Sequence, residues 1–140
     1  MPYSAYYGGE SPDPLASCPG YKTPSGPPIY LMLGLGTHDV QVNAHSFSSN
    51  GQELESCLFD KHTYNNPNSG QQELGRWALG FRDAVVVMPR DPLAPGTRYT
   101  VSVTAGGQNY HWSFTTSSAG LLAPISEEPL QAETGLLLNH

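Results

Sequence analysis

The stretch that decides the fold is "DPLAPGTRYTVSVTAGGQNYHWSFTT", residues 91–116. It opens with a proline–glycine corner, continues as an alternating strand over 98–105, and returns after "GGQ" as a second alternating strand over 109–116. Large apolar residues occupy every second position of both strands, so one face of this hairpin is predicted to be buried; the inward residues are Tyr99, Val101, Val103, Tyr110, Trp112 and Phe114.

Further strands are predicted upstream of this hairpin, over 29–35, 39–47, 52–60 and 83–89. The first is a continuous apolar run, which fits either a strand buried on both faces or a first core strand. The second alternates, and its inward residues are expected to be Val40, Val42 and Ala44, with Gln41, Asn43 and His45 outward. The third returns from an Asn-Gly turn, and the fourth is rich in β-branched residues and stops at a proline.

These strands are joined mostly by short turns, without intervening helical patterns, which predicts an all-β fold of antiparallel sheets packed face to face. We expect the β-sandwich to cover residues 29–116. An extended arm rich in Pro, Gly and Tyr would precede it over 1–28, and a Leu-rich tail or linker would follow over 117–140. The polar stretch 61–77 has no clear period and is expected to be a long loop, with room for a helical turn over 70–76.

Composition bounds the classes of function. Only 13% of the 140 residues are charged, the formal net charge is −6, and the few arginines are scattered singly. Without a basic patch we expect neither nucleic-acid binding nor attraction to an anionic membrane surface. No apolar run reaches the roughly 18 residues of a membrane-spanning helix, so no membrane insertion is predicted. The start, "MPYSAYYGGE", lacks the features of a signal peptide, so we expect either that the protein is not exported by that route or that this is a piece of a longer chain.

The two cysteines, Cys18 and Cys57, lie about 40 residues apart, and a bridge between them would contribute roughly 4 kcal/mol in the loop-entropy model. They could equally be buried and reduced, or unpaired, because pairing depends on geometry that the sequence does not give. Neither has a second ligand at metal-binding spacing, so no zinc site is expected.

The corner of the opening stretch, "PLAPGTRYTVSV", resembles that of fibronectin type III and related immunoglobulin-like domains. The resemblance implies that Pro95 and Gly96 carry the chain from one sheet to the other. It also implies that the Tyr99 hydroxyl stabilises the corner through a hydrogen bond to the backbone a few residues upstream, as in a tyrosine corner. The fold expected is therefore an antiparallel, immunoglobulin-like or fibronectin III-like β-sandwich.

A wider resemblance covers about residues 8–116 and rests on "GGESPDPL", "GPPIYLML", "DAVVVMPRDPLAPGTRYTVSV" and "YHWSFTT". In order and spacing these motifs are similar to the β-sandwich that follows the CAP domain (cysteine-rich secretory protein, antigen 5 and pathogenesis-related superfamily) in bacterial secreted proteins. The resemblance implies an exported, non-catalytic accessory module. The CAP domain itself is absent, with its paired His and Glu, so none of its site residues carries over.

We predict that the chain is not an enzyme. No Gly-x-Ser-x-Gly elbow occurs, and a triad would require a serine to converge with one of the scattered histidines, His38, His45, His62 or His111. Glu53 and Glu55 lie two apart, hence on one face of a strand, and are expected to be solvated acids rather than a hydrolytic pair.

No metal or cofactor is expected. Glu10, Asp13 and Asp60 could supply oxygen ligands to calcium at an end of the sandwich, but no EF-hand or repeat pattern accompanies them. No strand, Gly-rich turn and helix occur in the order that a dinucleotide site needs.

Two kinds of binding residue are candidates. Tyr64, Asn65, Asn66 and Trp77 could stack on and hydrogen-bond a sugar, although we favour Trp77 as a core residue and the asparagines as turn formers. The arm and tail could add strands to a neighbouring molecule; their candidate contacts are Tyr3, Tyr6, Tyr7, Leu121, Leu122, Leu136, Leu137 and Leu138. For the arm we favour instead that it lies across a sheet and buries its rings.

The sequence thus predicts a non-catalytic structural or adhesion module, extracellular or on a cell or particle surface. Its expected partner is a protein, either a second copy of the chain or a neighbouring domain. The first alternative is a self-assembling subunit of a filament or virion or cell-surface layer, connected through its termini. The second is a carbohydrate-binding module that recognises a cell-surface glycan.

Overall fold

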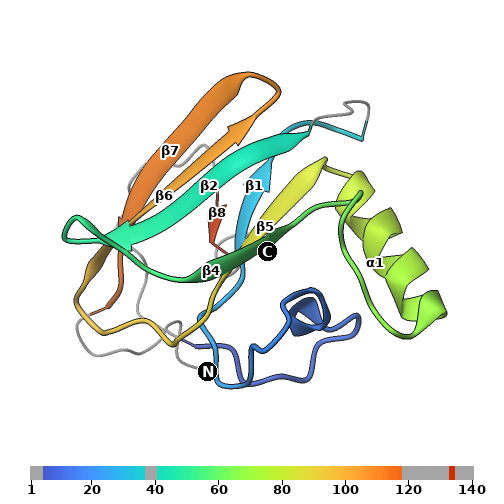
Figure 1. Ribbon diagram of the computed structural model, residues 1–140, viewed down its shortest axis with the longest axis horizontal. Coiled ribbons are helices and arrows are strands. Elements are labelled where there is room, and N and C mark those ends of the chain that lie inside the picture. The colour runs from blue at the N-terminus through green and yellow to red at the C-terminus, as the bar shows by residue number, and fades with distance from the viewer. Residues whose placement is uncertain (1–4, 37–40, 118–132, 135–140) are drawn as a thin grey trace.

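A computed structural model describes residues 5–36, 41–117 and 133–134 of the chain. Two four-stranded antiparallel sheets face each other in this structure (Figure 1), which confirms the predicted all-β sandwich. The strands are β1 (Ile29–Met32), β2 (Val42–Ser49), β3 (Gln52–Glu53), β4 (Ser56–Phe59), β5 (Ala84–Pro89), β6 (Arg98–Ala105), β7 (Gln108–Thr115) and β8 (Glu133–Thr134); the helices are the 3₁₀ turn η1 (Pro14–Ser17) and α1 (Ser69–Gly80).

The strand order matches that of immunoglobulin-like sandwiches. One sheet runs β4-β5-β1-β8 and the other β3-β2-β6-β7. In immunoglobulin-like domains the corresponding orders are D-E-B-A and C′-C-F-G. Strand β8 therefore occupies the position next to β1 that the first strand of such a domain takes, although β8 follows the other strands in the chain. Strand β1 begins at Ile29 and β7 ends at Thr115, close to the ends predicted for the sandwich.

The hairpin of β6 and β7 forms as predicted. Tyr99 pairs with Phe114 and Val101 with Trp112, and all four side chains are buried. The corner before it is fastened as the resemblance implied, because the backbone amide of Ala94 donates to the Tyr99 hydroxyl at 2.7 Å.

The core between the two sheets, called here the inter-sheet core, is a continuous apolar cluster. Phe47 of β2 stacks on Tyr99 with ring centroids 5.2 Å apart, and Tyr99 stacks in turn on Phe114 at 5.7 Å. Facing these rings are the inward residues of the other sheet, Ile29, Leu31, Val85 and Val87.

The predicted alternation in β2 is wrong at one point. Val42 pairs with Ala105 and Ala44 with Thr104. Two steps along β2 therefore correspond to one step along β6, which is a β-bulge. The bulge leaves Ala44 exposed, whereas His45 is half-buried. Val42 is half-buried against the core as expected, and Val40 lies outside the described residues.

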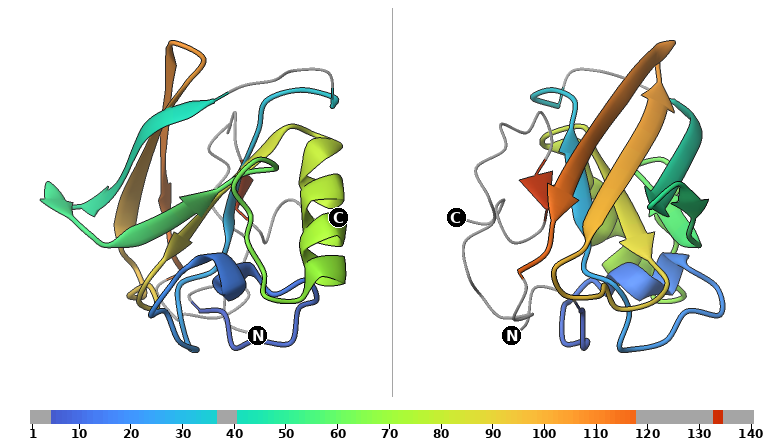
Figure 2. Two further views of the ribbon diagram at one scale, coloured as in Figure 1. Left: turned by 45° about the vertical axis from the view of Figure 1, so that its right-hand side comes forward. Right: turned by 90° about the vertical axis from the view of Figure 1, so that its left-hand side faces the viewer.

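The sandwich carries a third layer on the outer face of the β4-β5-β1-β8 sheet. The arm, η1 and α1 lie on the side of that sheet away from β6 and β7 (Figure 2). The cluster they enclose, called here the outer core, consists of Tyr6, Cys18, Phe59, Tyr64, Val86 and Met88. Strand β5 is consequently buried at every residue, since both of its faces are covered.

The loop predicted over 61–77 ends at α1, which spans Ser69–Gly80. This helix includes the turn expected over 70–76 and is longer than predicted. Asn68 caps the helix, and its side-chain oxygen accepts a hydrogen bond from the Gln71 amide at 2.9 Å. The helical period was hidden because glycines interrupt it and because several apolar side chains of α1 face solvent. Over the part of the chain described, no helix is long and apolar enough to cross a membrane.

Candidate functional site

Helix α1 packs on the outer core through a close contact at Gly75. A Cβ added at Gly75 would lie 2.5 Å from Cε2 of Tyr64, so only glycine lets the helix approach this ring. Arg76 strengthens the same contact, since its Nε donates to the Tyr64 carbonyl at 2.8 Å. Because successive residues of a helix are rotated by about 100°, Trp77, two positions after Gly75, points away from the Tyr64 ring.

The solvent-facing side of α1 is apolar. Leu74, Trp77 and Phe81 follow one another at spacings of three and four residues, which places them on one stripe of the helix and its C-terminal cap. Their exposed fractions are 44%, 62% and 54%, and the Trp77 and Phe81 rings meet edge to face with centroids 4.5 Å apart. We call this stripe the α1 ridge. Exposed aromatic pairs of this kind are unusual on a surface that touches only water.

A second face of α1 borders a groove of about 870 Å³, called here the α1 groove. Its floor is the outer face of β1 and β5, with Tyr30, Met32 and Val86, and its helical wall is formed by Ala78 and Leu79. The arm borders the groove near Tyr30, and the segment after β1 borders it beyond Met32. The volume and the largely apolar lining are those of a ligand or peptide site.

The two charged residues that line the α1 groove, Glu10 and Arg82, lie toward its two ends. Burial, together with the negative charge of Glu10, raises the pKa of Tyr30 to about 12, so the Tyr30 hydroxyl is neutral at physiological pH. Arg82 lines the groove near the far end of β1, where its backbone carbonyl accepts from the amides of Leu33 and Gly34 at 3.1 Å each. The groove therefore has an acidic end and a basic end.

The four residues predicted as a binding loop do not form one surface. Tyr64 is buried, which raises the pKa of its hydroxyl; this hydroxyl donates to the Asp13 carbonyl at 2.7 Å and accepts from the Asn66 side chain at 2.9 Å. Asn65 is bound through its backbone to Ser17. Trp77 lies on the α1 ridge and is exposed, so the expectation that it is a core residue is wrong.

The structure brings together one pair of groups that the sequence left scattered. Nε2 of His45 lies 3.2 Å from Oγ of Ser56, across the gap between β2 and β4. Among the described residues no carboxylate hydrogen-bonds the His45 ring, so the pair has no third group to orient a base. The carboxylates of Glu53 and Glu55 have different partners, since Glu53 accepts from the Phe47 amide and Glu55 pairs with Arg90 at 3.1 Å.

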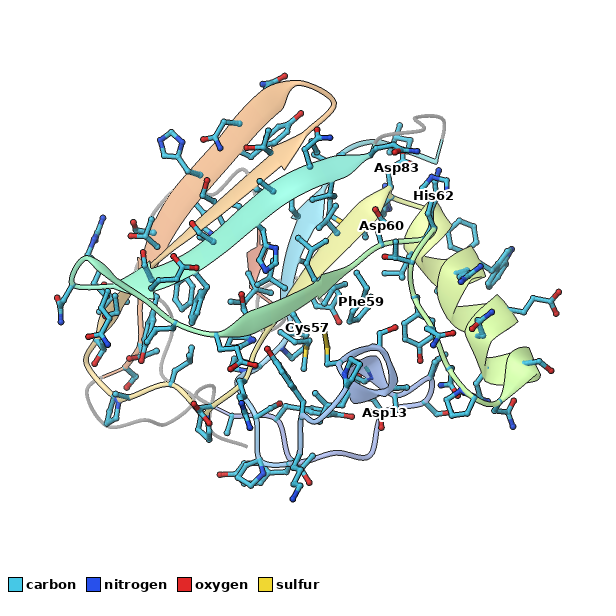
Figure 3. All side chains as sticks on the ribbon, viewed as in Figure 1. Asp13, Cys57, Phe59, Asp60, His62 and Asp83 are labelled. Carbon is cyan, nitrogen blue, oxygen red and sulfur yellow. A yellow bond between two sulfur atoms is a disulfide. The ribbon has the colours of Figure 1, made fainter. Side chains whose placement is uncertain are left out.

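The three carboxylates considered for calcium do not come together: Glu10 and Asp13 both lie near the Tyr6 hydroxyl, whereas Asp60 lies elsewhere (Figure 3). Asp13 caps η1 by accepting from the Leu15 amide, and Asp60 accepts from the amides of His62 and Thr63. Figure 3 shows Asp13 on the arm and Asp60 at the other end of the outer core, past the end of β4. Within the described residues no three His, Cys, Asp or Glu side chains gather as a metal site would require.

The arm is fixed to the sandwich covalently. Cys18 and Cys57, whose pairing the sequence left open, form a disulfide that joins the arm to β4. Tyr6 is buried in the outer core, as expected of an arm that lies across a sheet, whereas Tyr7 is 56% exposed. Outside the described residues lie the other candidate assembly contacts, Tyr3, Leu121, Leu122, Leu136, Leu137 and Leu138.

Trp77 was a candidate from the sequence, as were Tyr64 and Glu10, which line the α1 groove; Leu74, Phe81 and the groove as a site were not. The spacing of Leu74, Trp77 and Phe81 was an available signal, because it repeats at the helical period. The groove has no sequence signal, since its walls come from several separate segments. Comparisons with protein-family models, with curated proteins and with solved structures each found no match.

Proposed function

We propose that this chain is a non-catalytic interaction module of an extracellular protein and that it docks a protein partner through the α1 ridge. The observation that carries the proposal is the solvent-facing stripe of Leu74, Trp77 and Phe81 on a helix whose face at Gly75 is already packed. Large aromatic side chains dominate the binding energy of protein interfaces, and water alone gives them no stabilising contact.

The extracellular part of the proposal is supported by the disulfide between Cys18 and Cys57, because disulfides persist in oxidising compartments. The resemblance to the β-sandwich that follows CAP domains in bacterial secreted proteins points the same way.

The test is site-specific photo-crosslinking in cells that produce the full chain. A photoreactive phenylalanine analogue replaces Trp77 in one variant and His111, which is exposed on β7, in the matched control. We expect a discrete protein adduct from position 77 and none from position 111. Equal adducts at both positions, or none at either, would contradict docking through the α1 ridge.

A companion measurement separates docking from folding. Because Trp77 and Phe81 are more than half exposed, replacing both with alanine should leave the melting temperature nearly unchanged while removing the crosslink from a probe placed at Leu74. A large drop in melting temperature would show instead that the aromatic pair stabilises the fold.

A second candidate, the self-assembling subunit, is favoured by β8. Within the described residues this strand pairs with the edge of β1 at two positions, Ile29 with Thr134 and Tyr30 with Glu133. A strand that follows the rest of the sandwich and adds to a sheet edge can be supplied by a second copy as well as by its own chain. Light scattering of the full chain over a concentration series tests this, with Thr134→Pro to break the pairing and Glu133→Gln as control. A monomer at every concentration would exclude assembly.

A further inference from the structure

The α1 groove is held open by contacts at both ends of the helix. Near the start of α1, the Ser11 hydroxyl of the arm donates to Oε1 of Gln71 at 2.8 Å. Beyond its end, one carboxylate oxygen of Asp83 accepts a hydrogen bond from Lys61 Nζ at 3.0 Å, and the other accepts one from the Gly36 amide at 3.0 Å. Because both ends are fastened, the position of the helix over the sheet is fixed, and the groove is a built feature of the fold.

Small residues make the room in the groove. Ala78 lines it from the helix, Ala84 from β5 and Gly34 from the segment after β1, whereas Met32 and Leu79 supply its larger apolar surfaces. A floor of this kind suits aliphatic side chains, because they make dispersion contacts with it and it has few polar groups that need hydrogen-bond partners.

The two ends of the groove carry opposite charges. Glu10 lies at the end near Tyr30, where its charge acts on the Tyr30 hydroxyl. Arg82 lies at the end near Leu33 and Gly34. Among the described residues neither Glu10 nor Arg82 forms an ion pair. Over the four steps from Tyr30 to Gly34 an extended chain advances roughly 13 Å, which is also the length of about four residues of an extended peptide.

We propose that the α1 groove binds an extended segment of a partner polypeptide, with aliphatic side chains on the floor, a basic residue toward Glu10 and an acidic residue toward Arg82. This goes beyond docking through the α1 ridge, because the groove borders a different face of the helix and can be tested separately. The charge complementarity of the two ends selects a peptide over an uncharged apolar molecule, which would leave both charges unpaired.

The experiment measures the affinity of the full chain for four short fluorescent peptides by anisotropy. All four share the core Leu-Val-Leu and differ at the two outer positions, which are Arg and Glu, Arg and Arg, Glu and Glu, or Ser and Ser. We expect the Arg and Glu peptide to bind tightest. Each mismatched end should weaken binding about fivefold, the size of an exposed ion pair.

Charge reversal in the protein provides the sharper test. Arg82→Glu should turn the preference toward the peptide with two arginines, and Glu10→Lys toward the peptide with two glutamates, each by about fivefold. Both side chains are exposed, so these variants are expected to fold. If both variants keep the preference of the unaltered chain, the proposed orientation of charges is wrong.

Filling the groove tests its location. Ala78→Phe should weaken the Arg and Glu peptide by about tenfold or more, whereas Glu73→Phe places the same ring on α1 outside the groove and should have no effect. Trp77→Ala should also have no effect, which separates this site from the α1 ridge. Equal affinities for all four peptides, or no binding at about 1 mM, would overturn the proposal.

Discussion

The two cores of this molecule are built differently although they share the β4-β5-β1-β8 sheet. The inter-sheet core takes its side chains from regular strands, with Phe47, Tyr99 and Phe114 stacked in its centre. The outer core takes many of its side chains from irregular chain, and it is closed by a disulfide and by a helix that meets it at Gly75.

The fully packed core and the candidate binding groove lie on opposite faces of the shared sheet. The inter-sheet core lies between two hydrogen-bonded sheets and is filled by stacked rings. The outer core is covered by segments fastened at a few points, and the α1 groove opens between those points. Binding sites concentrate on such connecting segments, because a rigid scaffold positions them without packing them fully.

The largest expected effect is in the inter-sheet core. Phe47→Ala should lower the free energy of unfolding by about 4 kcal/mol, because the ring is 1% exposed and stacks on Tyr99. Urea denaturation measures the loss, with Ser46→Ala on the same strand as control. A loss below about 1 kcal/mol would mean that the sheets close over the cavity.

The next effect separates the two cores. Replacing Cys18 and Cys57 together with serine should cost about 3 to 4 kcal/mol, since the disulfide restrains the unfolded chain and fastens the arm. Hydrogen exchange should then rise in the arm and α1 while β6 and β7 stay protected. Equal exchange in both regions would show that the two cores unfold as one unit.

A smaller effect is expected at the contact of α1 with the outer core. Gly75→Ala should destabilise by about 1 to 2 kcal/mol despite the better helix propensity of alanine, because the new methyl group meets the Tyr64 ring. Gly70→Ala in the same helix meets only the side chain of Asn68, at 3.4 Å, and should stabilise slightly. Stabilisation by both substitutions would show that α1 shifts freely on the sheet.

The smallest effect at neutral pH concerns Tyr30. Its pKa of about 12 in the folded chain lies above the ordinary value of 10.0, so its contribution to stability is fully present below pH 10. That contribution is lost as pH rises toward 12, because the unfolded chain ionises more readily. Tyr30→Phe should remove one tyrosine that ionises at high pH from the ultraviolet titration. The loss of stability between pH 10 and pH 12 should also become smaller, with Met32→Leu as control. An unchanged titration would contradict the raised pKa.

Much of the sandwich was predictable because a strand pattern depends on neighbouring residues. Alternation in residues 98–116 predicted the inward set of β6 and β7, and the resemblance at the corner implied the bond to Tyr99, which Ala94 supplies. The bulge in β2 was not predictable, since it depends on the register against β6 and not on the sequence of β2 alone.

The candidate site was predictable only in part. Trp77 stood out as an aromatic residue in a polar stretch. Its exposure depends on the contact of Gly75 with Tyr64, which turns Trp77 toward solvent. Alternation and composition do not describe such a contact between separate segments. The sequence by itself determined the strands, most of their inward faces and the low charge, because these follow from neighbouring residues. Only the tertiary structure decided the disulfide, the third layer and the α1 groove, because each joins residues far apart in the chain.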